Sequence, residues 1–258
     1  TLDRPSAYVH EQITYRFRYY FENWLPTGES PQYGLPSFGG FASQIAGQFP
    51  ADESERVRVD GRAYYVEEIV VALFPIVSGP LEIGETRLVL PRVVDGARDL
   101  RTDGASVRVL ALPSPEPADF SGGVGEFTIE VTKADDHAEV GQGARFTVRI
   151  SGRGDLDTLT DFAPPTSSTG DVYAGATRTE ADIVDGQVGG VRVMEYIVVP
   201  RQAGATTVDF PSISTFSPMR GEYARADAHE VSVTVAAAPA PSSPPPPAPA
   251  SKLSLPVA

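Results

Sequence analysis

A short pattern of turn-forming residues occurs twice in this chain, and it constrains the fold more than any other feature. Val59-Asp60-Gly61 precedes an apolar segment that ends at Pro75, and Val184-Asp185-Gly186 precedes one that ends at Pro200. A glycine follows each proline at the same distance. Asp-Gly supplies the positive φ angles of a tight hairpin turn, proline ends a strand, and glycine permits the next turn. The repeat predicts two tandem copies of one β-rich domain.

Apolar and polar residues alternate with a period of two in both copies. The segments Gln12–Phe21 and Gly143–Ser151 show this pattern most clearly, and it is typical of half-buried strands. No segment sustains the 3.6-residue period of a core helix. The predicted fold class is all-β, with two tandem immunoglobulin-like β-sandwich domains of about 100 residues each. The predicted core of the second domain includes Phe146, Val148, Ile150, Tyr196 and Val198.

Proline-rich segments mark the predicted boundaries. Leu112–Pro117 carries three alternating prolines, which stiffen an extended linker. The predicted domains are therefore residues 1–114 and 115–236. Residues 237–258 are mostly Ala, Pro and Ser, a composition that predicts a disordered or polyproline II linker. The chain has no cysteine and no apolar run of about 18 residues, so it predicts neither disulfides nor a membrane-spanning helix.

The sequence offers few groups for catalysis. His10, His137 and His229 are the only histidines, and none is paired at metal-ligand spacing. A Cys-His nucleophile is impossible, and there is no Gly-x-Ser-x-Gly elbow. The net charge of −13 argues against binding to nucleic acid. We therefore expect no enzymatic activity, no catalytic residue, no cofactor and no resident metal.

Aromatic residues gather in the first domain. Six of them lie between Tyr15 and Trp24, and three more follow in a segment rich in Gly and Pro. In one interpretation alternate rings fill the core and the others cover its end. In the other, exposed rings beside glycine loops form a rim that binds a protein partner. The candidate partner-binding aromatics are Trp24, Tyr33, Phe38 and Phe41.

Several motifs in this order resemble the BatD family, the aerotolerance or oxygen-tolerance proteins. Pro117–Phe127 resembles the P-x-x-F-x-G-x-V-G-x-F signature that opens a BatD domain. Ile150–Leu156 resembles its I-S-G-x-G-N-L segment, with Asp155 where Asn is usual. Further matches are Glu195–Gly204, Ser214–Pro218, Gly221–Tyr223, and, in the first domain, Tyr8–Gln12 and Ala72–Pro75.

The resemblance implies a protein of the bacterial inner membrane whose immunoglobulin-like domains lie in the periplasm. Its membrane anchor would lie outside this segment. The resemblance also implies association with von Willebrand A-domain proteins and a MoxR-type AAA+ ATPase, in oxygen tolerance or the envelope stress response. The family has no established catalytic residues to carry over.

Loop carboxylates are a second candidate for partner binding. Asp155 and Asp157 lie in one predicted loop, and Asp52, Glu53 and Glu55 lie in another. Hard cations such as Mg²⁺ prefer oxygen ligands, so one of these acids could complete a metal site on a von Willebrand A-domain partner. The simpler interpretation is that both loops are only solvated.

Two functions remain open at this point. The first is a periplasmic scaffold or adaptor for protein–protein interaction. The alternative is a carbohydrate-binding or adhesin-like β-sandwich module, in which Tyr and Trp side chains in a shallow groove would stack on sugars. Aromatic rings that lie inside the domain or at one end of it would favour the adaptor. A hydrolase would need a deep pocket with convergent carboxylates.

Overall fold

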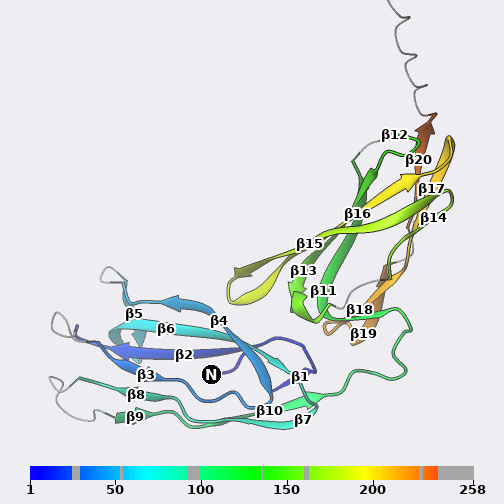
Figure 1. The fold of residues 1–258 in the computed structure, drawn as a ribbon. Coiled ribbons are helices and arrows are strands. Elements are labelled where there is room, and N and C mark those ends of the chain that lie inside the picture. Colours follow the sequence, from blue (N-terminus) through cyan, green and yellow to red (C-terminus); the bar gives the residue numbers. More distant parts are fainter. Residues whose placement is uncertain are drawn as a thin grey trace, which may run out of the picture.

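The computed structural model describes residues 1–24, 30–52, 55–91, 99–134, 136–159, 163–226 and 229–237. These residues form strands and one short 3-10 helix, so the all-β prediction is confirmed. Within them there is no helix that could span a membrane. Among the described strands, β1 to β10 pair with one another and β11 to β20 pair with one another (Figure 1). We call these two sets the N-terminal unit and the C-terminal unit. The predicted Pro/Ala-rich linker, from residue 238 onward, lies outside the described residues.

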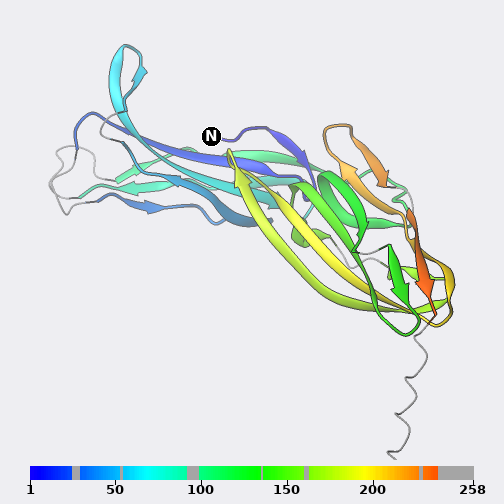
Figure 2. The same ribbon diagram turned by 90° about the horizontal axis from the view of Figure 1, so that it is seen from above.

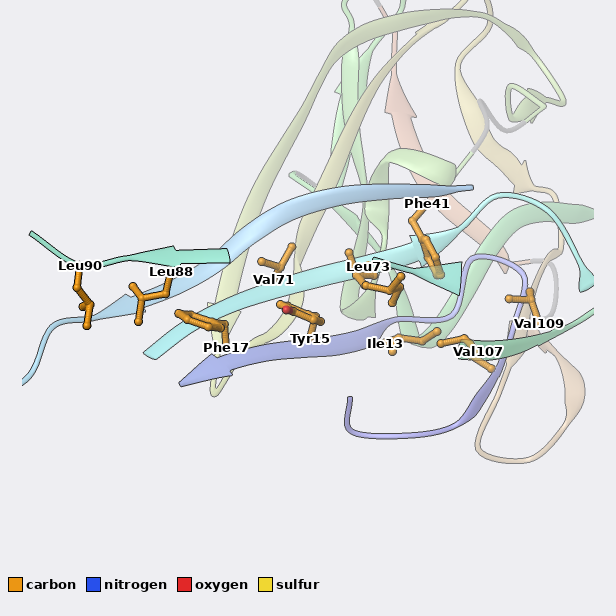
Figure 3. Close-up of a cluster of buried hydrophobic side chains, with 12 residues drawn as sticks. Ile13, Tyr15, Phe17, Phe41, Val71, Leu73, Leu88, Leu90, Val107 and Val109 are labelled. Carbon is orange, nitrogen blue, oxygen red and sulfur yellow. The ribbon is translucent and has the colours of Figure 1, made fainter. Parts of the chain in front are cut away.

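The N-terminal unit is a sandwich of two layers. The order β2-β6-β4 forms one sheet, and β1-β10-β7 and β3-β8-β9 form the layer that faces it. Figure 3 shows Ile13, Tyr15 and Phe17 of β2 in the same buried cluster as Val107 and Val109 of β10. The strands are β1 (Ser6–Tyr8), β2 (Ile13–Phe21), β3 (Gln32–Gly34), β4 (Phe41–Phe49), β5 (Val57–Val59), β6 (Arg62–Pro75), β7 (Gly79–Ile83), β8 (Arg87–Val89), β9 (Asp99–Arg101) and β10 (Ala105–Leu110).

The C-terminal unit repeats this plan with a larger first sheet. Its sheets have the orders β15-β16-β13-β11-β18-β19 and β12-β20-β17-β14. All five predicted core residues, from Phe146 to Val198, are buried, so that prediction is confirmed. The elements are β11 (Phe120–Lys133), β12 (His137–Glu139), β13 (Ala144–Gly154), the 3-10 helix η1 (Leu156–Thr158), β14 (Thr166–Ser167), β15 (Gly170–Val184), β16 (Gln187–Pro200), β17 (Gly204–Phe210), β18 (Ile213–Ser217), β19 (Glu222–Ala226) and β20 (His229–Ala236).

The two Asp-Gly pairs occupy equivalent hairpin turns, as the repeat predicts. Asp60-Gly61 joins β5 to β6 with φ angles of 49° and 81°, and Asp185-Gly186 joins β15 to β16 with 53° and 76°. Positive φ at both central residues is the geometry of a type I′ turn.

Backbone hydrogen bonds extend the equivalence to the other end of each hairpin. The N–H of His10 donates to the carbonyl of Pro75 over 2.8 Å, and the N–H of Gly141 donates to that of Pro200 over 2.9 Å. The two units are therefore copies of one strand plan.

The β15–β16 hairpin reaches the N-terminal unit, and its tip lies on the outer face of the β2-β6-β4 sheet (Figure 2). The outer face is the side turned away from the core. Gln12 holds the tip with both ends of its amide, because Nε2 donates to the Gly186 carbonyl over 2.7 Å and Oε1 accepts from the Val188 N–H over 2.8 Å. Val188 packs with Val70 and Ala72 in a buried apolar cluster.

A second contact joins the units beside the linker. The Tyr8 ring of β1 meets the buried Phe216 ring of β18 edge-on, with centroids 4.8 Å apart. The Tyr223 hydroxyl of β19 donates to the carbonyl of Pro113 over 2.9 Å. The N-terminal unit is therefore held at two places, by the hairpin tip and by these rings.

Replacing Gly186 with valine should detach the hairpin tip. A Cβ at Gly186 would stand 3.0 Å from Val70 Cγ1, whereas a Cβ at Gly61 would meet nothing within 4 Å. Both glycines have positive φ, so Gly61→Val is a control that carries the same backbone strain of about 1–2 kcal/mol. We expect the Val188 amide to lose its protection from hydrogen exchange in Gly186→Val and to keep it in Gly61→Val. Equal protection in both variants would contradict the docking contact.

Candidate protein-docking surface

Aromatic side chains surround the end of the N-terminal unit that lies farthest from the docked hairpin. They come from the end of β2 and from the β5–β6 hairpin, which extend beyond β4. Tyr20 and Trp24 are the exposed rings of this set, at 41% and 42%. We call this set the distal aromatic surface, and it consists of Tyr20, Phe21, Trp24, Arg56, Tyr64 and Tyr65.

Tyr65 supports the part of this surface that Phe21, Trp24 and Arg56 form. Its ring is buried and lies 5.0 Å from the Trp24 ring and 5.5 Å from the Phe21 ring. The Arg56 guanidinium stands 4.3 Å from the Tyr65 ring centroid and donates to its hydroxyl over 2.6 Å. A cation over an aromatic face is attracted by the ring quadrupole. The arrangement holds Trp24 at the surface against a fixed base.

Apolar side chains continue this surface along the outer face of the sheet. Val57 and Val59 of β5 and Phe49 of β4 are exposed by 39%, 42% and 52%. The same face is covered by the hairpin tip at Val70 and uncovered here. Exposed apolar groups that gather in one place mark interaction sites more often than single exposed ones do.

The four predicted aromatics are not brought together at one surface. Trp24 is exposed and belongs to the distal aromatic surface. Phe41 lies in the core, only 8% exposed, and Phe38 packs against that core with its ring 5.4 Å from Tyr15. Tyr33 and Phe41 lie in β3 and β4 and not in a loop, because both are needed to close the N-terminal sandwich.

A carboxyl group lies at the open end of the same sandwich. The Tyr33 hydroxyl donates to Glu67, which is half-buried in β6. Burial raises the pKa of the Glu67 carboxyl above its ordinary value. Burial, and then the charge of Glu67, raise the pKa of the Tyr19 hydroxyl. The Tyr33–Glu67 pair faces the interior of the sandwich and does not add to the distal aromatic surface.

The two predicted carboxylates of the C-terminal unit differ in accessibility. Asp155 is the N-cap of η1, where its side chain accepts from the Asp157 N–H over 3.0 Å. Burial raises the pKa of the Asp155 carboxyl. The charge of Asp157 adds to this rise, while the bond from the Asp157 N–H and the charge of His10 oppose it. Asp157 itself is exposed. Of the two, Asp157 is the one open to a partner.

The second acidic loop is described only in part. Asp52 and Glu55 are exposed, and the Glu55 N–H donates to the Asp52 carbonyl over 3.2 Å. Glu53 lies outside the described residues. These groups are solvent-facing, and nothing ranks one above another as a ligand.

The described ranges contain no group of three or more His, Asp or Glu side chains placed to hold a metal ion. One small cavity of about 20 Å³ lies in the C-terminal unit, between Val148, Met194 and Phe210. Its lining is almost entirely apolar and includes no carboxylate. It has room for about one water molecule. This cavity does not offer the convergent acids that glycoside hydrolysis needs. A larger open cleft of about 420 Å³ in the N-terminal unit includes Glu67 and Glu68, but adjacent residues of a strand point to opposite faces of the sheet.

Sequence reasoning missed the docked hairpin. One signal was present, because Ile69–Phe74 is apolar without interruption whereas the neighbouring strands alternate. A continuous apolar run is typical of a strand buried on both faces. Val71 and Leu73 face the core, and Val70, Ala72 and Phe74 face the hairpin.

Residues 131–235 match a protein family described as the BatD DUF11-like domain. The match begins within β11 and covers less than half of the chain. The chain therefore carries a BatD DUF11-like domain, and the resemblance seen in the motifs is confirmed for this part. The comparison with curated proteins gives no match.

Among solved structures, the similar ones include bacterial surface proteins. The Escherichia coli adhesin FdeC is 16% identical, with 91% of this chain and 62% of that one covered and a TM-score of 0.29. The Yersinia pseudotuberculosis adhesin InvE is 14% identical, with 91% and 58% covered and a TM-score of 0.25. The C-terminal domain of the Streptococcus agalactiae AgI/II polypeptide BspA is 9% identical, with 90% and 95% covered and a TM-score of 0.23. The chain spans less than two thirds of the first two structures, and at these TM-scores the likeness supports no argument about function.

Replacing Asp155 with asparagine should not destabilise the chain at neutral pH. The amide oxygen can accept the same capping bond, and the variant carries no buried charge. The folded-state pKa of Asp155 lies above the ordinary value near 3.9. At a pH between these two pKa values, folding takes up a proton. The stability of the wild type therefore falls as the pH rises from the ordinary pKa through the folded-state pKa. Urea unfolding at pH 4 and pH 7 should show a smaller pH dependence in Asp155→Asn. A variant clearly less stable than the wild type at pH 7 would show that the charge itself stabilises the fold.

Proposed function

We propose that this chain is a non-catalytic scaffold segment that binds a protein partner through the distal aromatic surface. The observation that carries the proposal is the exposed Trp24 ring on the Arg56–Tyr65 support. The exposed Tyr20 ring packs against Tyr64 on the other face of the same two strands. Trp, Tyr and Arg are the residue types that contribute most to binding energy at protein interfaces. A rigid base under Trp24 lowers the entropy lost when a partner binds.

The position of this surface supports the same function. The hairpin tip covers the other half of the outer face, at Val70 and Ala72. The distal end is thus left open, while the C-terminal unit and its linker lie at the opposite end of the N-terminal unit (Figure 1). A scaffold needs this separation, since one end must bind the partner and the other must connect to the rest of the protein.

Carbohydrate binding is the less favoured function. Sugar rings stack on flat aromatic faces that are open to solvent. Here the Trp24 ring meets Phe21 at 86° and Tyr65 at 55°, and Tyr20 meets Tyr64 at 86°. These rings pack edge to face or tilted at one end of the unit, and among them Tyr20 borders an open cleft of about 380 Å³. Such packing suits a protein interface better than a sugar platform.

The BatD DUF11-like domain supports a finer proposal about place and partners. The scaffold would stand on the periplasmic side of the bacterial inner membrane, with its anchor outside this segment. Its partners would be von Willebrand A-domain proteins linked to a MoxR-type ATPase, in oxygen tolerance or envelope stress. These partners are proposed from the family alone, and the distal aromatic surface is where we place their contact.

The chain should be used as bait on solubilised bacterial membranes, and the captured proteins identified by mass spectrometry and then titrated singly. We expect Trp24→Ala to weaken binding by about tenfold or more, as loss of a hot-spot residue does. Tyr173→Ala is the matched control, because Tyr173 is a still more exposed ring (55%) on β15 of the C-terminal unit. Equal affinities for the wild type and both variants would contradict the assigned surface.

The proposed metal bridge has its own test on the same captured partner. If a chain carboxylate completes the partner's metal site, EDTA and Asp157→Asn should each weaken binding, and together they should weaken it no further. Asp155→Asn serves as control, because that side chain is engaged in capping η1. If neither EDTA nor Asp157→Asn changes the affinity for the partner, the interface does not involve a metal.

A further inference from the structure

The chain contains two copies of one hairpin tip, and only one copy is docked. Residues 59–61 and 184–186 share the sequence Val-Asp-Gly and the same left-handed turn geometry. The second tip is seated on the N-terminal unit. The first tip is exposed at the distal end, where a Cβ on Gly61 would meet nothing within 4 Å.

The seated tip is recognised mainly through its backbone. The carbonyls of Asp185 and Gly186 accept from Arg16 and Gln12 over 3.4 Å and 2.7 Å, and the Val188 N–H donates to Gln12. The absence of a side chain at Gly186 permits the close approach to Val70. A backbone-directed contact can be repeated by any tip of the same conformation.

The exposed tip has the groups that this contact uses. Asp60 and Gly61 present carbonyls with the same φ geometry, and Ala63 stands at the position of Val188 with an N–H and a small apolar side chain. Arg62 takes the place of Gln187, whose side chain makes only a longer bond of 3.3 Å to Thr14.

Among the residues that the structure describes, the outer face of the first sheet in each unit is unsuited to receive the exposed tip. The outer face of the N-terminal unit is occupied by the second tip. In the C-terminal unit the repeat places Gly143 where Gln12 stands and Glu195 where Val70 stands. Glycine has no side-chain amide to hold the tip, and a glutamate would be desolvated beneath it. The receiving face must therefore lie outside these two units.

We propose that the Asp60–Gly61 tip docks on the outer sheet face of an immunoglobulin-like domain in a partner protein. That face presents a side-chain amide at the start of an edge strand and small apolar residues on the adjacent central strand, as Gln12, Val70 and Ala72 do here. The inference deepens the proposed function and rests on it, because Val57, Val59 and the tip adjoin the distal aromatic surface.

The first test asks whether the exposed tip is competent to dock. Gln187→Arg with Val188→Ala gives the seated hairpin the tip sequence of the exposed one within the full chain. We expect the amide of residue 188 to keep its protection from hydrogen exchange, and adding Gly186→Val to abolish it. If the double variant already loses protection of this amide as fully as the triple variant does, the proposal is overturned.

The second test supplies a receiving face from another molecule. Isotope-labelled wild-type chain is titrated to millimolar concentration with the unlabelled Gly186→Val chain, whose outer face is open, and amide shifts are followed by NMR. We expect shifts at Gly61 to Ala63, none with wild-type chain as titrant, and none when the titrant also carries Gln12→Ala. No shift at these amides with the open chain would overturn the proposal. A negative result in this titration would not affect Trp24-dependent capture of a partner, so the docking of the tip and the proposed function can be rejected independently.

Discussion

The amide of Gln12 is the contact on which the arrangement of the two units depends. It is buried, and it satisfies one carbonyl and one N–H of a hairpin tip that lies more than 170 residues away in the sequence. A buried donor or acceptor left without a partner costs about 1–3 kcal/mol. Removing this side chain would therefore leave two backbone groups of the tip unsatisfied against an apolar surface. The same two bonds set the distance at which Val188 can enter the cluster around Val70 and Ala72.

Glycines let β11 pass closely beside β13, and β16 closely beside β15. A Cβ at Gly125 would stand 2.1 Å from the Arg153 carbonyl oxygen, and one at Gly152 would stand 2.1 Å from that of Glu126. Gly190 is equally restricted on β16. Gly125 and Gly152 belong to the segments that resemble the BatD signatures, and here they have a structural role. They allow the close approach of β11 and β13, the strands beside the arm that joins the units.

Much of the fold could be predicted from local sequence. The period-two alternation located the buried faces of β2 and β13, and Asp-Gly predicted both type I′ turns. Two features could not be read in this way. Tyr33 and Phe41 were placed in a loop because Gly and Pro surround them, yet closure of the sandwich draws both into strands. The docking of residue 186 on Gln12 joins segments that are far apart in the sequence, so no local pattern predicts it. The unbroken apolar run Ile69–Phe74 indicates only that both faces of this strand are covered. The distal aromatic surface was found in part through Trp24, whereas Arg56 carries no sequence pattern that would single it out.

The docked hairpin tip holds the two units in one fixed arrangement. The chain has no cysteine, so spin labels can be placed at Glu82→Cys on β7 and Thr234→Cys on β20, two exposed strand positions in different units. Pulsed electron–electron double resonance then reports the distribution of distances between the two spin labels. A single narrow distribution that broadens on adding Gln12→Ala is the predicted result. A distribution that is already broad in the labelled wild type, and unchanged by Gln12→Ala, would contradict it.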